Sequence, residues 1–166
     1  FAWDAVIELT GENGPRRVPI EAFYLAAGRV DLRPDELQTA ILIPRESYEN
    51  CFGHYIKYAM RNAMDIATTG CSVNVVLSED KRTIRRARIA YGVAGPVPLR
   101  ARTAEKTAEG RPFTAETAEA FAAAVLEDIR PRDSWRASKA FREHIAVELA
   151  QRCLIEAGRR AGGVPA

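Results

Sequence analysis

The 166-residue sequence predicts an α+β fold, an antiparallel sheet with C-terminal helices packed on one of its faces. Two observations predict this class. The first part of the chain holds short segments in which apolar residues alternate, and from about residue 103 the apolar period changes to 3.6. In addition, only the six residues SEDKRT join two strand-like segments. No crossover helix fits in that length, which favours antiparallel neighbours.

The first elements are predicted as strands around short turns. DAVIELTGENGPRRVPI predicts two short strands joined by the Gly-rich turn GENG. EAFYLAAGRVDLRP follows as a loop or short helix, with Gly28 as its stop. After Pro34, DELQTAILIP predicts a strand. One face of this strand would carry Leu37, Thr39, Ile41 and Ile43.

Three further segments predict the main sheet: CFGHYIKYA, CSVNVVL and TIRRARIAYGVAG, with SEDKRT as the hairpin connection between the last two. In the second, Val73, Val75 and Leu77 share a face. In the third, strict alternation places Arg85, Ala87, Ile89 and Tyr91 on one face and Ile84, Arg86, Arg88 and Ala90 on the other.

Two helical segments complete the predicted fold. TAETAEAFAAAVLEDI is Ala-rich, with Thr114 as a candidate N-cap, and Pro131 ends it. SKAFREHIAVELAQRCLIEAGRRAGG starts at Ser138 as a cap and closes at Gly162 and Gly163. Its apolar residues recur every four positions and predict a core stripe made of Phe141, Ile145, Leu149, Cys153 and Ala157.

The composition limits the classes of function. Apolar residues make up 47% and charged residues 28%, with a net charge of +2, which is typical of a soluble globular domain. The acids nearly balance the cations, so we expect no nucleic-acid partner despite the arginines of RRARIA and RPRDSWRASK. No run approaches the roughly 18 apolar residues of a membrane helix, and no signal peptide is visible, so we expect a cytoplasmic protein. The chain lacks an initiating Met, which suggests a piece of something longer.

The residues that often ligate metals are scattered. Cys51, Cys71 and Cys153 lie far apart and form no CxxC pair, so we expect reduced, mostly buried thiols and no metal. His54 and His144 are isolated in the sequence. The sequence also holds no GxGxxG, no P-loop and no nucleophile elbow. Composition and periodicity alone therefore stop at a soluble α+β domain.

Two motifs carry more information. The first is KYAMRNAMDIATTGCSVNVVL, with the pattern Lys57-x-x-x-Arg61-x-x-x-Asp65-Ile-Ala. The second lies in SWRASKAFREHIAVELAQRCLIEA and reads Arg136-x-Ser138-Lys139-x-Phe141-Arg142. With VPIEAFYLAAGRVDLRPDELQTAILIP before them and RIAYGVAGPVPLRA between, they resemble the FAD-binding subunits of bacterial molybdenum hydroxylases, most closely the xanthine dehydrogenase type. The resemblance covers essentially the whole chain.

The resemblance implies a domain organisation. In that family this segment is the C-terminal half of the subunit, and the upstream half carries the Gly-rich loops that hold the FAD pyrophosphate. Residues 1–45 would be the tail of the FAD-binding domain, and residues 46–166 the C-terminal α+β domain of the carbon monoxide dehydrogenase flavoprotein kind. We therefore expect little or no FAD on this piece alone.

The resemblance also implies a function. The chain would be an oxidoreductase component that passes electrons from molybdopterin and 2Fe-2S clusters, held by two partner subunits, through FAD to NAD. A second hypothesis is an assembly module of the same complex, with flavin binding on the missing half. A nucleic-acid binder is the weakest of the three.

The resemblance assigns candidate site residues. A Lys at the position of Lys57 reaches the FAD, where a cation favours the reduced, anionic flavin. Gln38 stands at a second flavin contact, usually aliphatic in the family. Arg61 and Asp65 lie in a possible flavin-side loop. The alternatives are a Lys57 that extends along a strand into water and an Asp65 that ties the loop and pairs with Arg61.

A further group of basic residues allows two interpretations. The cluster is either a partner-facing patch or a solvated helix start, and it consists of Arg130, Arg132, Arg136, Lys139 and Arg142. Trp135 beside it is either an interface anchor or a core residue.

Overall fold

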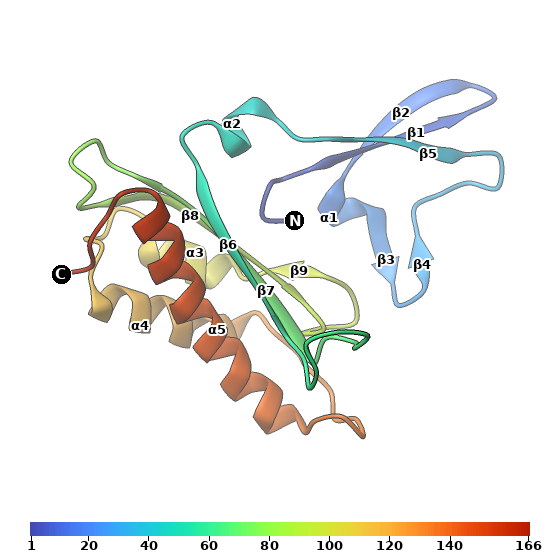
Figure 1. Ribbon diagram of the computed structural model, residues 1–166. Helices are drawn as coiled ribbons and strands as arrows, with labels where there is room; N and C mark the ends of the chain where they lie inside the picture. The colour runs from blue at the N-terminus through green and yellow to red at the C-terminus, as the bar shows by residue number, and fades with distance from the viewer.

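The computed structural model describes residues 1–166 and shows two parts, a small strand-rich part at the N-terminus and a larger α+β part. In the larger part a four-stranded sheet carries helices on one face (Figure 1). Every strand pairing in the molecule is antiparallel. The predicted α+β class is confirmed.

The N-terminal part contains two sheets and one short helix. The three-stranded sheet has the order β2-β1-β5, and β3 and β4 form a separate hairpin. The elements are β1 Val6–Gly11, β2 Gly14–Pro19, α1 Ile20–Phe23, β3 Tyr24–Ala26, β4 Arg29–Val30 and β5 Leu37–Leu42. A small core joins them, made of Ile7, Leu9, Val18 and Phe23.

One prediction in this part is wrong. Gly28 ends no helix, because the short helix α1 already stops at Phe23. Gly28 has φ of +71° and forms the turn of the β3–β4 hairpin. A left-handed residue suits a tight hairpin as well as a helix end, so the glycine alone does not distinguish the two.

The larger part is built on the sheet β6-β7-β8-β9. A single turn of helix, α2 (Arg45–Tyr48), leads into it. The strands are β6 Phe52–Tyr58, β7 Thr69–Leu77, β8 Ile84–Gly92 and β9 Leu99–Arg100. On β7 the side chains of Val73, Val75 and Leu77 are buried, as their alternation predicts.

A bulge in β8 overturns part of the predicted facing. The register of β7 and β8 shifts between Val76 and Leu77, so that Val76 faces Arg86 while Leu77 faces Ile84. The extra residue is Arg85, which is exposed, and Ile84 turns into the core beside Ala87. Strict alternation had placed Ile84 and Ala87 on opposite faces, and one inserted residue reverses that relation.

Helices cover one face of the sheet. They are α3 Arg102–Ala108, α4 Ala115–Ala124 followed by a 3₁₀ turn at Val125–Glu127, and α5 Lys139–Arg160. The predicted caps are confirmed, because the Thr114 side chain accepts from Thr117 N and the Ser138 side chain from Phe141 N. α5 packs on β6 and β7, and the main core lies between the sheet and the helices. No helix combines the length and the apolar character needed to cross a bilayer.

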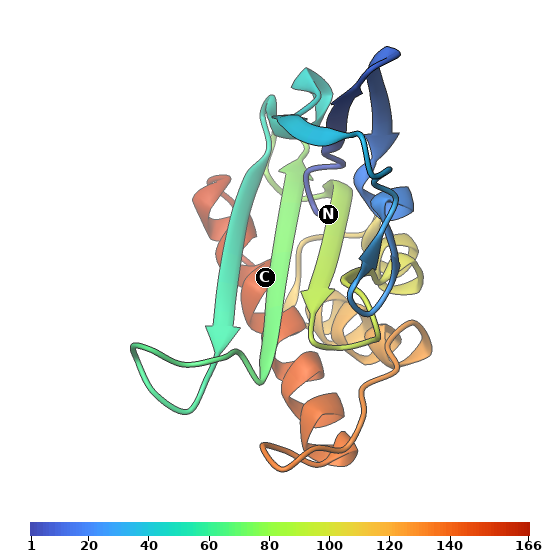
Figure 2. The ribbon, with the colours of Figure 1, turned by 90° about the vertical axis from the view of Figure 1, so that its right-hand side faces the viewer.

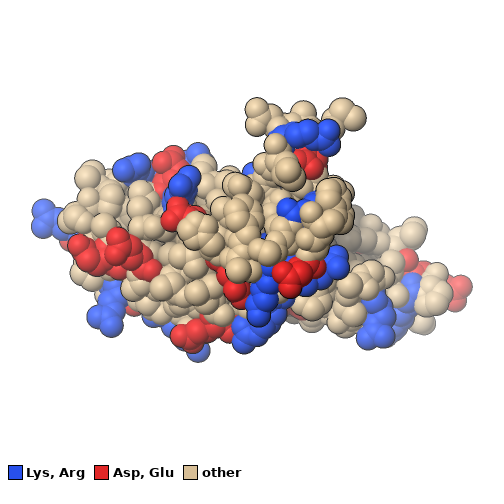
Figure 3. Space-filling model, turned by 90° about the horizontal axis from the view of Figure 1, so that it is seen from below, with Lys and Arg blue, Asp and Glu red and all other residues tan.

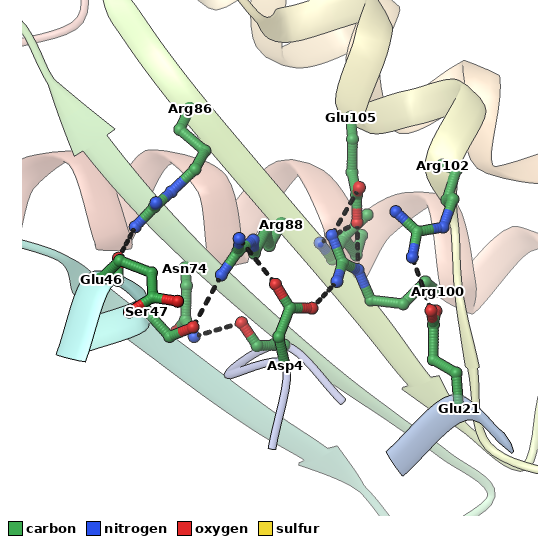
Figure 4. A network of polar contacts seen from close by, with 12 residues as sticks. Asp4, Glu21, Glu46, Ser47, Asn74, Arg86, Arg88, Arg100, Arg102 and Glu105 are labelled. Carbon is green, nitrogen blue, oxygen red and sulfur yellow. Dashed lines mark hydrogen bonds and ion pairs between the residues drawn. The ribbon is translucent and has the colours of Figure 1, made fainter. Parts of the chain in front are cut away.

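The N-terminal part is attached to the other face of the sheet. Asn74 of β7 donates from Nδ2 to the carbonyl oxygen of Ala2 over 2.9 Å. The carboxylate of Asp4 pairs with Arg88 (2.6 Å) and with Arg100, and Arg100 also pairs with Glu105 of α3 (2.5 Å) (Figure 4). The helix-free face is therefore covered at one end and open at the other, as Figure 2 shows.

Candidate functional site

Lys57 lies on the open face of the sheet. Its neighbours in β6, Ile56 and Tyr58, pack against the main core, so the alternation of the strand turns Lys57 away from the helices. Lys57 is exposed, opposite Gly70 of β7. Asn74, four residues after Gly70 in β7, belongs to the same face and donates a hydrogen bond to the carbonyl oxygen of Ala2. Lys57 therefore shares its face with the N-terminal segment.

A strip of two glycines lies beside Lys57 in the sheet. The register aligns Lys57 with Gly70 and Gly70 with Gly92, across three neighbouring strands. A Cβ added at Gly92 would meet no atom within 4 Å, and one added at Gly70 would lie 3.0 Å from the Tyr55 hydroxyl. The Tyr55 ring therefore covers Gly70, whereas the backbone at Gly92 stays open to the approach of a flat group.

The loop of residues 59–68 projects beyond the ends of β6 and β7 (Figure 2). Lys57 donates from Nζ to the carbonyl oxygen of Asp65 over 2.6 Å. The Asp65 carboxylate turns inward and accepts from the backbone N–H groups of Arg61 (2.9 Å) and Ile66 (2.8 Å). Partial desolvation opposes ionisation, but these donors outweigh it and lower the pKa of the Asp65 carboxyl below its usual value. Asp65 therefore organises the loop.

Arg61 is exposed and does not pair with Asp65 through its guanidinium. Its Nη2 donates instead to the carbonyl oxygen of Met64 over 2.8 Å. Met64 has φ of +51° and is 94% exposed, so the loop presents an apolar side chain at a strained position. Arg61 therefore pairs with Asp65 through its backbone N–H, while its guanidinium bonds to Met64.

Gln38 is not part of this cluster. It lies on β5, in register with Leu9 of β1, and is exposed. The register of β1 and β5 shifts between Glu8 and Leu9, which pair with Ala40 and Gln38, so Thr39 is an extra residue. The predicted common face of Leu37 and Ile41 is therefore wrong, although both are exposed, at 73% and 59%. The structure brings together Lys57, Arg61 and Asp65, and it leaves Gln38 on a separate sheet.

The basic residues near the start of α5 divide into two kinds. Trp135 is 82% exposed, with the guanidinium of Arg136 4.1 Å from its ring centre, so a core role for Trp135 is wrong. Arg142 is only 5% exposed, so it does not belong to a solvated face. Viewed from below, basic and acidic side chains are interspersed over the surface (Figure 3).

Sequence reasoning missed the glycine strip and Tyr55. Their proximity depends on strand register, for which the local sequence carries no signal. The three cysteines are free, with Cys71 and Cys153 buried and Cys51 half-buried. No group of three or more His, Cys, Asp or Glu side chains is arranged to hold a metal ion.

Comparisons with known proteins place this geometry in context. The chain is 41% identical over 161 residues to the putative xanthine dehydrogenase FAD-binding subunit of Escherichia coli, covering 97% of this chain and 54% of that protein. It is 28% identical to the carbon monoxide dehydrogenase medium chain of Hydrogenophaga pseudoflava, covering 96% and 54%. The chain thus spans about half the length of the curated relatives it matches.

Solved structures agree on the fold. A chain of carbon monoxide dehydrogenase from Hydrogenophaga pseudoflava superposes with a TM-score of 0.87 at 29% identity, covering 96% of this chain and 54% of that one. Quinoline 2-oxidoreductase from Pseudomonas putida 86, at 22% identity, shares the fold with a TM-score of 0.86. The family model of the CO dehydrogenase flavoprotein C-terminal domain matches residues 54–157, which include Lys57, the loop and α5 up to Ala157. The chain therefore belongs to the CO dehydrogenase flavoprotein C-terminal domain family.

Proposed function

We propose that this chain is the C-terminal part of the flavoprotein component of a xanthine dehydrogenase-like molybdenum hydroxylase. The observation that carries the proposal is the 41% identity, over 97% of the chain, to a protein named as a xanthine dehydrogenase FAD-binding subunit. In the proposed complex, electrons pass from molybdopterin and 2Fe-2S clusters on two partner subunits to FAD and then to NAD. The proposed location is the cytoplasm.

The open face of the sheet fits a flavin. When bound, FAD supplies the ring that accepts and passes on the electrons. Lys57 would hold a positive charge at the edge of that ring, and the open backbone at Gly92 would leave room for its plane beside Tyr55. A cation there stabilises the reduced, anionic form, by about 1 kcal/mol near water and a few kcal/mol in a dry site. Arg61 and Asp65 would form the wall of the site through the loop.

Exposed apolar side chains on and beside β5 support the idea that further polypeptide covers the N-terminal part. Leu37 and Ile41 of β5 and the neighbouring Ile43 have exposed fractions of 73%, 59% and 47%. Several large apolar side chains so close together are more typical of a covered surface than of a solvated one. We propose that the upstream half of the subunit covers these side chains and that it holds the pyrophosphate of FAD.

Flavin content tests the proposal. The 166-residue protein, purified alone, should show little flavin absorbance, and the same chain extended by its upstream half should carry FAD near one to one. An extended chain that binds no flavin would contradict the proposal. If the extended chain binds flavin but Lys57→Met leaves its potential and turnover unchanged, residues 46–166 act in assembly and not at the cofactor.

A further inference from the structure

Arg142 is a buried cation without a counter-ion. It lies near the start of α5 and is 5% exposed. One guanidinium nitrogen donates to the carbonyl oxygen of Thr68 and another to the Ser134 hydroxyl over 2.8 Å. Its Nε is buried and has no partner at all. Burial, and then the nearby charges of Arg132 and Arg136, lower the pKa of Arg142 below its usual value.

Thr68, whose carbonyl oxygen accepts from Arg142, lies at the base of the 59–68 loop. Thr68 is the last residue before β7, and its N–H donates to the carbonyl oxygen of Tyr58, the last residue of β6, over 2.8 Å. This pair closes the loop. Three residues before Thr68, the Asp65 carbonyl holds Lys57. Two cations therefore hydrogen-bond to the same loop, Arg142 from the helix α5 and Lys57 from the strand β6.

Stability does not account for this arginine. A desolvated cation with an unpaired N–H destabilises the folded state. The carbonyl of Thr68 also accepts from the Thr69 hydroxyl over 2.8 Å, so it keeps a partner if the arginine is removed. An apolar side chain of similar length would fill the same space and would eliminate the unpaired donor.

We propose that Arg142 is a positioning residue, which fixes the base of the 59–68 loop and thereby the place of the Lys57 ammonium on the open face. The link from Lys57 to the flavin rests on the proposed function, whereas the link from Arg142 to the loop does not. Ser134 extends the anchor, because it ties the guanidinium to the segment that carries Trp135 and Arg136.

Limited proteolysis of the 166-residue protein tests the anchor. Trypsin cleaves after Arg61 only if the loop opens locally, so the cleavage rate there reports loop order. Arg142→Met should raise that rate about tenfold while the melting temperature stays the same or rises. Arg142→Lys, whose ammonium can reach one of the two acceptors, should be cleaved after Arg61 at a rate between those of the unaltered protein and Arg142→Met. The matched control is Arg152→Met on the same helix, where an exposed arginine pairs only with Glu148.

Two outcomes would overturn the anchor. One is an unchanged cleavage rate after Arg61 in Arg142→Met. The other is a lower melting temperature with faster cleavage at every site, which would reveal a general structural role.

A flavin readout on the extended, FAD-containing chain tests the consequence. Arg142→Met should shift the flavin potential in the same direction as Lys57→Met, and the double variant should not exceed Lys57→Met alone. A released loop with an unchanged potential would overturn the positioning of Lys57 while leaving the proposed function intact. If the extended chain lacks FAD, the proposed function fails, and the proteolysis result alone decides whether the loop is anchored.

Discussion

Lys57 donates from its ammonium nitrogen to the main-chain carbonyl of Asp65, and the carboxylate of the same aspartate points elsewhere. The ammonium is therefore held in place without being neutralised by an ion pair. An exposed lysine on a strand is usually mobile, with several rotatable bonds. Here the loop restricts that freedom and preserves the positive charge on the open face.

Replacing Lys57 by Met tests the effect of this charge. In the FAD-containing chain the flavin potential should fall by roughly 20–60 mV, the equivalent of about 1–3 kcal/mol for a two-electron couple, because the reduced anion loses a stabilising cation. Stability should change by less than about 1 kcal/mol, since one exposed hydrogen bond is lost. A redox titration measures the first and urea unfolding the second. Lys106→Met, which removes an exposed charge from α3, should leave the potential unchanged.

Gly92→Val tests the open strip. The added side chain meets no atom within 4 Å in this chain, and Gly92 does not have a left-handed φ, so folding should be unaffected or slightly favoured. If a planar ring lies over Gly92, the extended chain should lose at least about tenfold in FAD affinity through steric exclusion. Flavin fluorescence during titration of the extended chain with FAD measures this affinity. Full retention of FAD would show that the ring does not cover Gly92.

The sequence predicted the elements better than their contacts. The longer strands and the long helix were recognised because their periods of 2 and 3.6 are local properties of the chain. The short strands β3, β4 and β9 were not predicted. The position of Ile84 was missed because a bulge opposite Val76 and Leu77 depends on the partner strand. The burial of Arg142 was missed for the same reason, since its acceptor Thr68 lies 74 residues away.

The candidate site was predictable only in part. The motif gave Lys57, Arg61 and Asp65, which are close in sequence and stay close in the structure. The position of the Gly70–Gly92 strip beside Lys57 depends on the strand register of two hairpins, which no residue type in the sequence indicates. Gln38 came from the resemblance alone, and its place on β5 sets it apart from the loop.

Asp4→Asn tests the attachment of the two parts. The Asp4 carboxylate bridges Arg88 and Arg100, whose side chains are only 17% and 3% exposed. Asparagine tolerates the φ of +45° found at this position, so the change removes charge while keeping the backbone. The free energy of unfolding should fall by about 1–3 kcal/mol, below the full cost for a buried pair because Asp4 is 35% exposed. Urea unfolding measures it, with Glu12→Gln in the exposed first turn as the control. Equal midpoints for the two variants would rule out an energetic role for the bridge.

Glu36 makes the stability of the N-terminal part depend on pH. Its carboxylate accepts from Arg16 Nε (2.6 Å) and Nη2 (2.8 Å), and from the backbone N–H of Arg33 (2.8 Å). The hydrogen bonds from Arg16, aided by the one from Arg33, lower the pKa of Glu36 to about 2. A carboxyl whose folded pKa is depressed contributes stability above its unfolded pKa, and that contribution is lost as the pH falls through the folded value. The contribution of Glu36 should therefore be complete above about pH 5 and disappear towards pH 2.

The matched variant is Glu36→Gln, which keeps the shape and removes the charge. At pH 7 its urea midpoint should lie below that of the unaltered protein. Arg16 then loses one of its two carboxylate partners and keeps only Asp31 as a charged acceptor. The gap between the two midpoints should narrow steadily between about pH 4.5 and pH 2, since only the unaltered protein must take up the proton. A gap that stays constant over that range would mean that the carboxylate of Glu36 does not interact with Arg16 in solution.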